Sequence, residues 1–377
     1  MTAVTARSSG WAQRIEAATP AGRDRTVDAL RAVAVVGVVV GHWLVSALVS
    51  DPTRPDRLHG ASPLGYLPDL SPVSWLLETL GAFFFAGGFA AARSLRGRAP
   101  LGWLGRRLSR LVRPVLVLLA VWLPAELLLV AVDTPADTRH VILSLVSHPL
   151  WFVLVYVVLT AATPVVRAAM VRCGLWTVAV PVSVVVLADL LRSGGLPRWL
   201  WVADVLAGWL VPYLLGVALA EGRLRGRGAG AVLLATGVLG GAALTGLAGY
   251  PTSAVGVPGD GSWSNLDPPS LFAVALSAAQ IGLFLLVRPW LARWLRHPSR
   301  WAPVAAVNLV ALTVFCWHQS ALLLVTLGAL AAGRFPGLHD VPRSLYWVVH
   351  RLAWFPVFLL ALAVLTLVFR RLERRPG

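Results

Sequence analysis

Long apolar stretches alternate along this chain with short segments that are rich in polar residues. In windows of about 20 residues, the length needed to cross the hydrocarbon core of a bilayer, about ten stretches predict transmembrane helices. They cover approximately residues 27–50, 72–93, 112–133, 149–168, 175–192, 199–220, 229–249, 270–288, 303–332 and 345–369. The pattern therefore predicts an all-α integral membrane protein with about ten transmembrane helices.

The composition agrees with this fold class. Of the 377 residues, 57% are hydrophobic and only 13% are charged, against about a quarter in soluble domains. The polar connection 251–269 is rich in Gly, Pro and Ser and is typical of a loop. We expect an N-terminal tail at 1–26, one polytopic domain at 27–369 and a basic tail at 370–377.

The charged residues indicate the orientation of the chain in the membrane. All 33 basic residues are arginines, and they cluster before the first span and in every second connection, at 93–113, 223–227, 288–300 and 370–375. Because cytoplasmic loops are enriched in Arg and Lys, both termini are predicted to be cytoplasmic, in a multi-pass protein of the plasma membrane. The net charge of +16 is then a topology signal, and we expect no nucleic-acid partner.

The first span carries polar residues that are costly in a bilayer. Its sequence, DALRAVAVVGVVVGHWL, contains Asp28, Arg31 and His42. On a helix the eleven steps from Arg31 to His42 turn through ~1100° and rise ~16 Å, which puts both side chains on one face. Asp28 lies one turn before Arg31 and can pair with it. In a structural alternative, Arg31 extends to the lipid headgroups, Asp28 caps the helix and His42 bonds to backbone.

A second histidine is predicted at a similar depth. His318, in FCWHQSALLL, lies in the ninth span, which runs in the same direction as the first. Both histidines are therefore expected to converge on one cavity. His148 lies at the outer end of the fourth span, where we expect a structural role. Glu126, in the outer half of the third span, is a candidate proton relay or counter-ion.

Motifs for several other chemistries do not occur. The sequence has no HExxH or CxxC pair, no GxSxG turn and no P-loop, so we expect no metal. Acyl transfer with a histidine as general base requires none of these motifs, because the imidazole takes the proton of an attacking hydroxyl.

The first span resembles that of the acyltransferase 3 family, the bacterial type of membrane-bound O-acyltransferase. Arg31 and His42 match the family's arginine followed after ten residues by a histidine. Further similar segments occur in the family's order: LGAFFFAGGF at 80–89, RRLSRLVRP at 106–114, HPLWFVLVY at 148–156, LAGWLVPYLLGVAL at 206–219, SNLDPPSLFAVALSAAQ at 264–280 and FCWHQSALL at 315–323. Gly87 and Gly88 stand where the family often has a serine, so no role for that hydroxyl carries over to this chain.

The resemblance implies an activity and a set of site residues. The donor would be cytoplasmic acyl-coenzyme A, for instance acetyl-coenzyme A, and the acceptor a hydroxyl of a glycan, glycolipid or similar molecule at the membrane. His42 would be the general base, with Arg31 facing the donor and His318 beside the catalytic histidine. Arg106, Arg107 and Arg110 would bind the donor's phosphates. Without an appended extracytoplasmic domain, the membrane domain is expected to act alone or with a separate partner.

Two other function classes fit the same pattern. A transporter or flippase of a lipid-linked sugar also has many spans and buried charges. An accessory scaffold of a polysaccharide assembly needs neither Arg31 nor His42. For the arginines of 93–113, an alternative is that they only set topology and bind anionic lipid.

Overall fold

The apolar stretches fold into helices that cross the molecule side by side. In the computed structural model the described residues are 10–50, 53–54, 57–257 and 263–373. Arg7 and the second half of the predicted basic tail, residues 374–377, lie outside them. The longer helices are α2 (Arg25–Val45), α4 (Leu80–Leu95), α5 (Pro100–Ala131), α7 (Leu150–Cys173), α8 (Ala179–Leu191), α9 (Arg198–Ala220), α10 (Gly226–Gly246), α11 (Leu271–Trp294), α12 (Pro298–Leu330) and α14 (Phe355–Glu373).

Shorter elements connect these helices. They are α1 (Trp11–Ala17), α3 (Ser74–Leu77), α6 (Ala136–Ser147), α13 (Leu345–Ala353), the 3-10 turns η1 (Pro63–Gly65), η2 (Pro68–Val73), η3 (Gly174–Val178) and η4 (Arg192–Gly194), and the strands β1 (Ala47–Ser50) and β2 (Leu58–Ala61). The two strands form an antiparallel hairpin in which Ala47 pairs with Ala61 and Ser50 with Leu58.

The helices confirm an all-α integral membrane protein. Within the described residues, nine helical segments are long and apolar enough to cross a membrane. One of them, Ala136–Gly194, contains α6, α7 and α8, and the chain turns between α7 and α8 at Gly174, whose φ is +59°. The predicted spans 149–168 and 175–192 are therefore two helices of one continuous helical segment.

Three predicted spans differ from the helices observed. The stretch 27–50 ends as a helix at Val45, and its last four residues form β1; a short buried strand and the end of a buried helix have the same apolar pattern. The stretch 72–93 is interrupted at Glu78, whose ψ of 99° separates α3 from α4. The stretch 345–369 is divided at Trp354 into α13 and α14. Pro356 lies in the first turn of α14, where the N–H that a proline lacks would have no partner within the helix.

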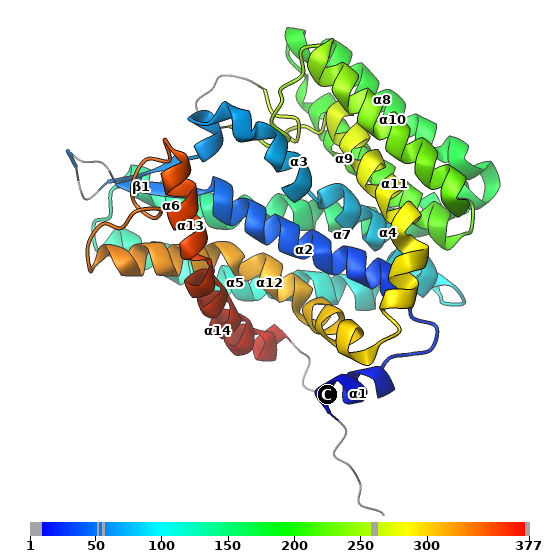
Figure 1. Ribbon diagram of the computed structural model, residues 1–377, viewed down its shortest axis with the longest axis horizontal. Coiled ribbons are helices and arrows are strands. Elements are labelled where there is room, and N and C mark those ends of the chain that lie inside the picture. The colour runs from blue at the N-terminus through cyan, green and yellow to red at the C-terminus, as the bar shows by residue number, and fades with distance from the viewer. Residues whose placement is uncertain (1–9, 51–52, 55–56, 258–262, 374–377) are drawn as a thin grey trace, which may run out of the picture.

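Close helix packing depends on glycines. A Cβ at Gly88 of α4 would lie 2.1 Å from the carbonyl oxygen of Tyr213 in α9, and one at Gly216 of α9 would lie 2.0 Å from that of Phe85. The backbones of α4 and α9 thus touch, as small residues allow in membrane helices. In Figure 1, α2 and α12 cross the middle of the molecule, and α8, α9, α10 and α11 gather at the upper right.

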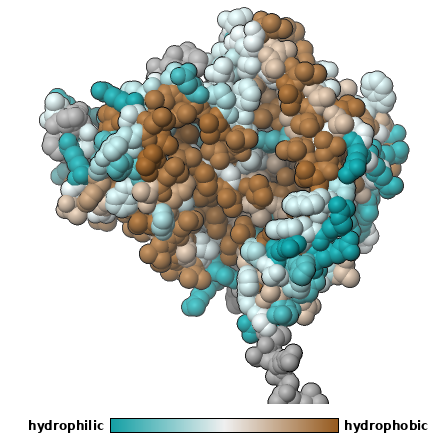
Figure 2. All heavy atoms as spheres, in the orientation of Figure 1, coloured by the Kyte–Doolittle hydropathy of each residue, from teal (hydrophilic) through white to brown (hydrophobic). Residues whose placement is uncertain are grey.

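The surface matches a membrane setting. Figure 2 shows a broad hydrophobic zone across this face, with hydrophilic residues gathered at its edges. Leu101, Leu127 and Leu247 are among the exposed large apolar side chains. An apolar surface of this extent is typical of a lipid-facing protein.

Candidate functional site

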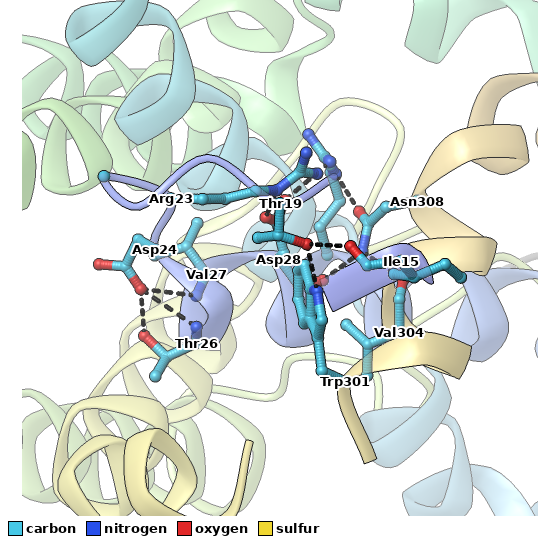
Figure 3. A network of polar contacts seen from close by, with 12 residues as sticks. Ile15, Thr19, Arg23, Asp24, Thr26, Val27, Asp28, Trp301, Val304 and Asn308 are labelled. Atoms are coloured by element: carbon cyan, nitrogen blue, oxygen red, sulfur yellow. Dashed lines mark hydrogen bonds and ion pairs between the residues drawn. The ribbon is translucent and has the colours of Figure 1, made fainter. Parts of the chain in front are cut away.

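The start of α2 is fixed by a network of polar contacts. Asp24 caps the helix by accepting hydrogen bonds from the backbone N–H groups of Thr26 (3.1 Å) and Val27 (3.2 Å), as Figure 3 shows. It also pairs with Arg288 of α11 at 2.7 Å. Burial raises the pKa of the Asp24 carboxyl, but the bonds from Thr26 and Arg288 outweigh burial and leave that pKa below its usual value. The cap is therefore a charged one and ties α2 to α11.

Arg31 is held by two helices. Its Nη2 donates to Asp28, as predicted, at 2.9 Å, and its Nε donates to Asn308 of α12 at 2.5 Å. Asn308 in turn donates to the backbone oxygen of Asp28 at 2.7 Å, and Figure 3 shows these two residues facing each other across α2 and α12. The guanidinium is thus oriented before any ligand arrives.

Arg31 lines a cavity of about 860 Å³ together with the arginines predicted to bind the donor. Seven arginines line it, and Glu373 is the one carboxylate among its lining residues. The arginines are Arg31, Arg98, Arg106, Arg107, Arg110, Arg113 and Arg370. The cavity therefore lies in a strongly positive field, which favours an anionic ligand.

Arg107 is the most firmly placed of the α5 arginines. It donates to the hydroxyl of Ser94 at 3.1 Å, and its guanidinium lies 5.5 Å from the centre of the Trp103 ring. Its Nε is buried and has no hydrogen-bond partner within the described residues. A buried donor without a partner is costly, and an anionic oxygen in the cavity is the type of group that would satisfy it.

The two predicted histidines contact each other. Nε2 of His318 lies 3.2 Å from Nδ1 of His42, and the ring centres are 4.9 Å apart. His318 is fully buried, whereas His42 is only half-buried. The convergence of the first and ninth predicted spans is therefore observed in the pairing of α2 with α12.

The hydrogen bonds fix which nitrogen holds a proton in the neutral pair. Nδ1 of His318 lies 2.6 Å from the carbonyl oxygen of Phe315, which only accepts, so this nitrogen carries the proton and Nε2 carries the lone pair. Nδ1 of His42 then faces two acceptors, His318 Nε2 and the Val38 oxygen at 3.0 Å, and must be the protonated nitrogen. The lone pair of His42 is consequently on Nε2, the form a general base needs.

The cavity and the histidine pair are separate but adjacent. The cavity is lined at one end by Phe83, Phe152 and Tyr156, and neither His42 nor His318 lines it. The ring of Phe152 lies 4.9 Å from that of Phe315, which lies 5.8 Å from the His318 ring. Two packed rings, Phe152 and Phe315, thus connect the lining of the cavity with His318, in contrast to the predicted common cavity, and we call these two rings the aromatic layer.

The other candidate residues have partners elsewhere. Glu126 forms an ion pair of 2.6 Å with Arg139, between α5 and α6, which is the counter-ion role. His148 is an exposed residue at the end of α6. No group of three His, Cys, Asp or Glu side chains suited to a metal occurs in the part of the chain that the structure describes.

The sequence reasoning missed two polar residues of the site. Asn308 is a polar residue in an otherwise apolar stretch, ten positions before His318, and this contrast was a usable signal. The indole of Trp43 donates to the backbone oxygen of His318 at 2.9 Å. Tryptophans are so common in this chain that nothing in the sequence distinguishes this one.

The apolar helices thus define a polytopic membrane protein with an arginine-lined cavity close to a pair of contacting histidines. The chain belongs to the acyltransferase 3 family, because the sequence model described as "Acyltransferase domain" matches residues 24–371, nearly its whole length. No curated protein and no solved structure gives a significant match. The protein is thus a multi-pass membrane acyltransferase.

Proposed function

We propose that this protein transfers a short acyl group, acetyl in the simplest case, from cytoplasmic acyl-coenzyme A to a hydroxyl of a glycan or glycolipid at the plasma membrane. One observation supports this assignment above the others. The four arginines expected to hold the donor, Arg31, Arg106, Arg107 and Arg110, line one cavity. Phe152 lines the same cavity and packs against Phe315, which contacts His318.

The donor's phosphates suit the arginine-lined cavity. Arginine forks match phosphate oxygens in charge and geometry, and a volume of about 860 Å³ is within the range of small-molecule sites. Arg31 and His42 are ~16 Å apart along α2, so an extended donor would place its charged end at Arg31 and its thioester nearer His42.

The chemistry needs one base and no covalent enzyme intermediate. Nε2 of His42 takes the proton from the acceptor hydroxyl as its oxygen attacks the thioester carbonyl carbon. The carbon–sulfur bond then breaks, and the departing coenzyme A thiolate takes the proton from His42. His318 accepts a hydrogen bond from His42 Nδ1 throughout and so stabilises the imidazolium that forms between these two steps.

An assay with labelled donor distinguishes acyl transfer from transport and from a scaffold role. Purified protein in lipid vesicles is incubated with radiolabelled acetyl-coenzyme A and a bacterial glycolipid fraction, and label on the lipid is counted. We expect His42→Ala to lower transfer by about 10²–10⁴-fold, the usual contribution of a general base. His297→Ala, which changes an exposed histidine that precedes α12 and does not line the cavity, serves as the matched control and retains transfer.

The other outcomes contradict the proposal in distinct ways. If transfer persists in His42→Ala, then His42 is not the general base. Movement of the glycolipid across the vesicle membrane without label identifies a transporter. If neither label transfer nor movement occurs with any acceptor fraction, an accessory scaffold is the better reading.

A further inference from the structure

A fully buried arginine lies outside the cavity lining and has no part in the proposed chemistry. Arg351 of α13 has no exposed surface. Its Nε donates to the Trp43 carbonyl oxygen at 2.7 Å, its Nη1 to that of Gly337 at 3.0 Å, and its Nη2 to that of Ser46. Within the described residues it forms no ion pair with a carboxylate. All three nitrogens of this buried cation are therefore used on backbone carbonyls.

Two of those carbonyls belong to the end of α2 that carries His42. Trp43 follows His42 directly, and Ser46 is the residue that ends the helix, with its N–H donated to the His42 oxygen at 2.9 Å. The last carbonyls of a helix have no partner within it, and a cation there is favoured by the helix dipole. Arg351 thus closes the turn of α2 in which His42 lies.

The same residues also connect to His318. The indole of Trp43 donates to the His318 backbone oxygen at 2.9 Å, and the Trp43 ring packs edge-on against Phe355 at 5.6 Å. Arg351 itself lies over the rings of Trp347 and Phe358, at 5.4 and 5.0 Å. A continuous path of contacts therefore runs from the guanidinium through Trp43 to the backbone of the second histidine.

We infer that Arg351 is a positioning residue for the His42–His318 pair. Its hydrogen bonds set where α2 ends relative to α12 and hold the two imidazoles 3.2 Å apart. This role rests on the proposed function, because the 3.2 Å contact matters for rate only if His42 is the base. A misplacement of about 1 Å in a catalytic group costs up to ~100-fold in rate.

The test compares two replacements of Arg351. Arg351→Met keeps much of the side-chain volume and removes every donor, whereas Arg351→Lys keeps the charge and three N–H donors. In purified protein with acetyl-coenzyme A we expect Arg351→Met to lower kcat at least about tenfold with KM for the donor little changed. Arg351→Lys is expected to recover most of kcat. Arg343→Met, at an exposed arginine just before α13, is the matched control and keeps wild-type values.

A second variant covers the case in which Arg351→Met does not fold. Trp43→Phe keeps an aromatic ring and removes only the indole donor to His318, so we expect folded protein with a lower kcat and an unchanged KM. If Arg351→Met lowers the melting temperature while the folded fraction keeps its kcat, the arginine is merely structural and the inference fails. It fails equally if Trp43→Phe and Arg351→Lys both show wild-type kcat and the Met variant does not fold.

A spectroscopic measurement separates this inference from the proposed function. Nitrogen-15 NMR of histidine-labelled protein, with the His42 signals assigned by their loss in His42→Ala, reports which ring nitrogen is protonated. We expect neutral His42 protonated at Nδ1 in the wild type and in Arg343→Met, and a mixture of tautomers in Arg351→Met and Trp43→Phe. An unchanged tautomer in both of the latter overturns the inference, whether or not the protein transfers acyl groups.

Discussion

At the residue scale, the proposed function requires the acyl group to pass from the cavity by the aromatic layer toward the histidines. Phe152 is buried, lines the cavity, and packs 4.9 Å from Phe315 and 5.0 Å from Phe83. Phe152 and Phe315 form the continuous path from the cavity to the His318 ring. Under the proposed function, the space around these rings would set which acyl groups reach His42.

Phe152→Leu is expected to relax the selection of the acyl group. The smaller side chain leaves room for additional methylenes, each of which is worth roughly 10–200-fold in discrimination. We expect the ratio of kcat/KM for butyryl- over acetyl-coenzyme A to rise by about tenfold or more. Competition between the two donors measures this ratio. Phe284→Leu, which changes an aromatic ring of α11 outside the cavity lining, should leave this ratio unchanged. If Phe152→Leu is active and its ratio equals that of the wild type, the aromatic layer does not select the acyl group.

Much of the site could be predicted at this scale because charges and imidazoles are rare in apolar stretches. Asp28, Arg31, His42 and His318 all stood out in that way, and the structure places them as two contacting pairs. Asn308 and Arg351 were not assigned, because their partners are about 280 and 308 positions away along the chain. A single sequence contains no signal of which helices are neighbours.

At the element scale, α4 is the helix whose packing is least tolerant. Gly87 would place a Cβ 2.4 Å from the ring of Tyr156, and Gly88 would place one 2.1 Å from the Tyr213 oxygen. A serine at either position, as the family often has nearby, would force α4 away from α7 or α9. The two glycines that depart from the family pattern thus lie where α4 directly contacts α7 and α9.

Gly88→Ser is expected to destabilise the protein. A backbone carbonyl cannot move aside as a side-chain end can, and overpacking of this kind costs about 1–3 kcal/mol or more. We expect a lower melting temperature in detergent and less folded protein per cell. Gly328→Ser is the matched control, because a Cβ at Gly328 of α12 meets nothing within 4 Å. Equal melting temperatures for the two variants would contradict the close contact between α4 and α9.

The extents of the helices could be predicted only where the apolar period was uninterrupted. The predicted span 199–220 agrees with α9 to within one residue, at Arg198–Ala220. The break at Glu78 and the turn into β1 after Val45 depend on long-range contacts, such as the bond from Gln280 to the Glu78 oxygen and that from Arg351 to Ser46. Hydropathy indicates which segments are buried. Because the chain stays at least partly buried through both interruptions, hydropathy alone does not locate them.

At the scale of the whole molecule, the arginines have two explanations that the fold alone does not separate. Arginine-rich connections orient a membrane protein, and the same side chains gather around the cavity from α2, α5 and α14. If they only set topology or bind anionic lipid, then their position relative to the cavity is irrelevant. If they bind the donor, only the arginines that line the cavity affect catalysis.

Two double substitutions of equal charge therefore decide between these explanations. Arg106→Gln with Arg110→Gln removes two positive charges from the cavity lining, and we expect KM for acetyl-coenzyme A to rise by about tenfold or more, since each hydrogen bond to a charged group contributes about 1.5–3 kcal/mol. The effect of added salt on KM should shrink, because screening then acts on fewer charges.

Arg293→Gln with Arg296→Gln removes the same charge from exposed positions that do not line the cavity, and should leave KM unchanged. Because His42 and His318 are unchanged in both double variants, we expect both to keep the wild-type kcat. Equal KM values for the two double variants would assign the arginines to topology and lipid binding alone.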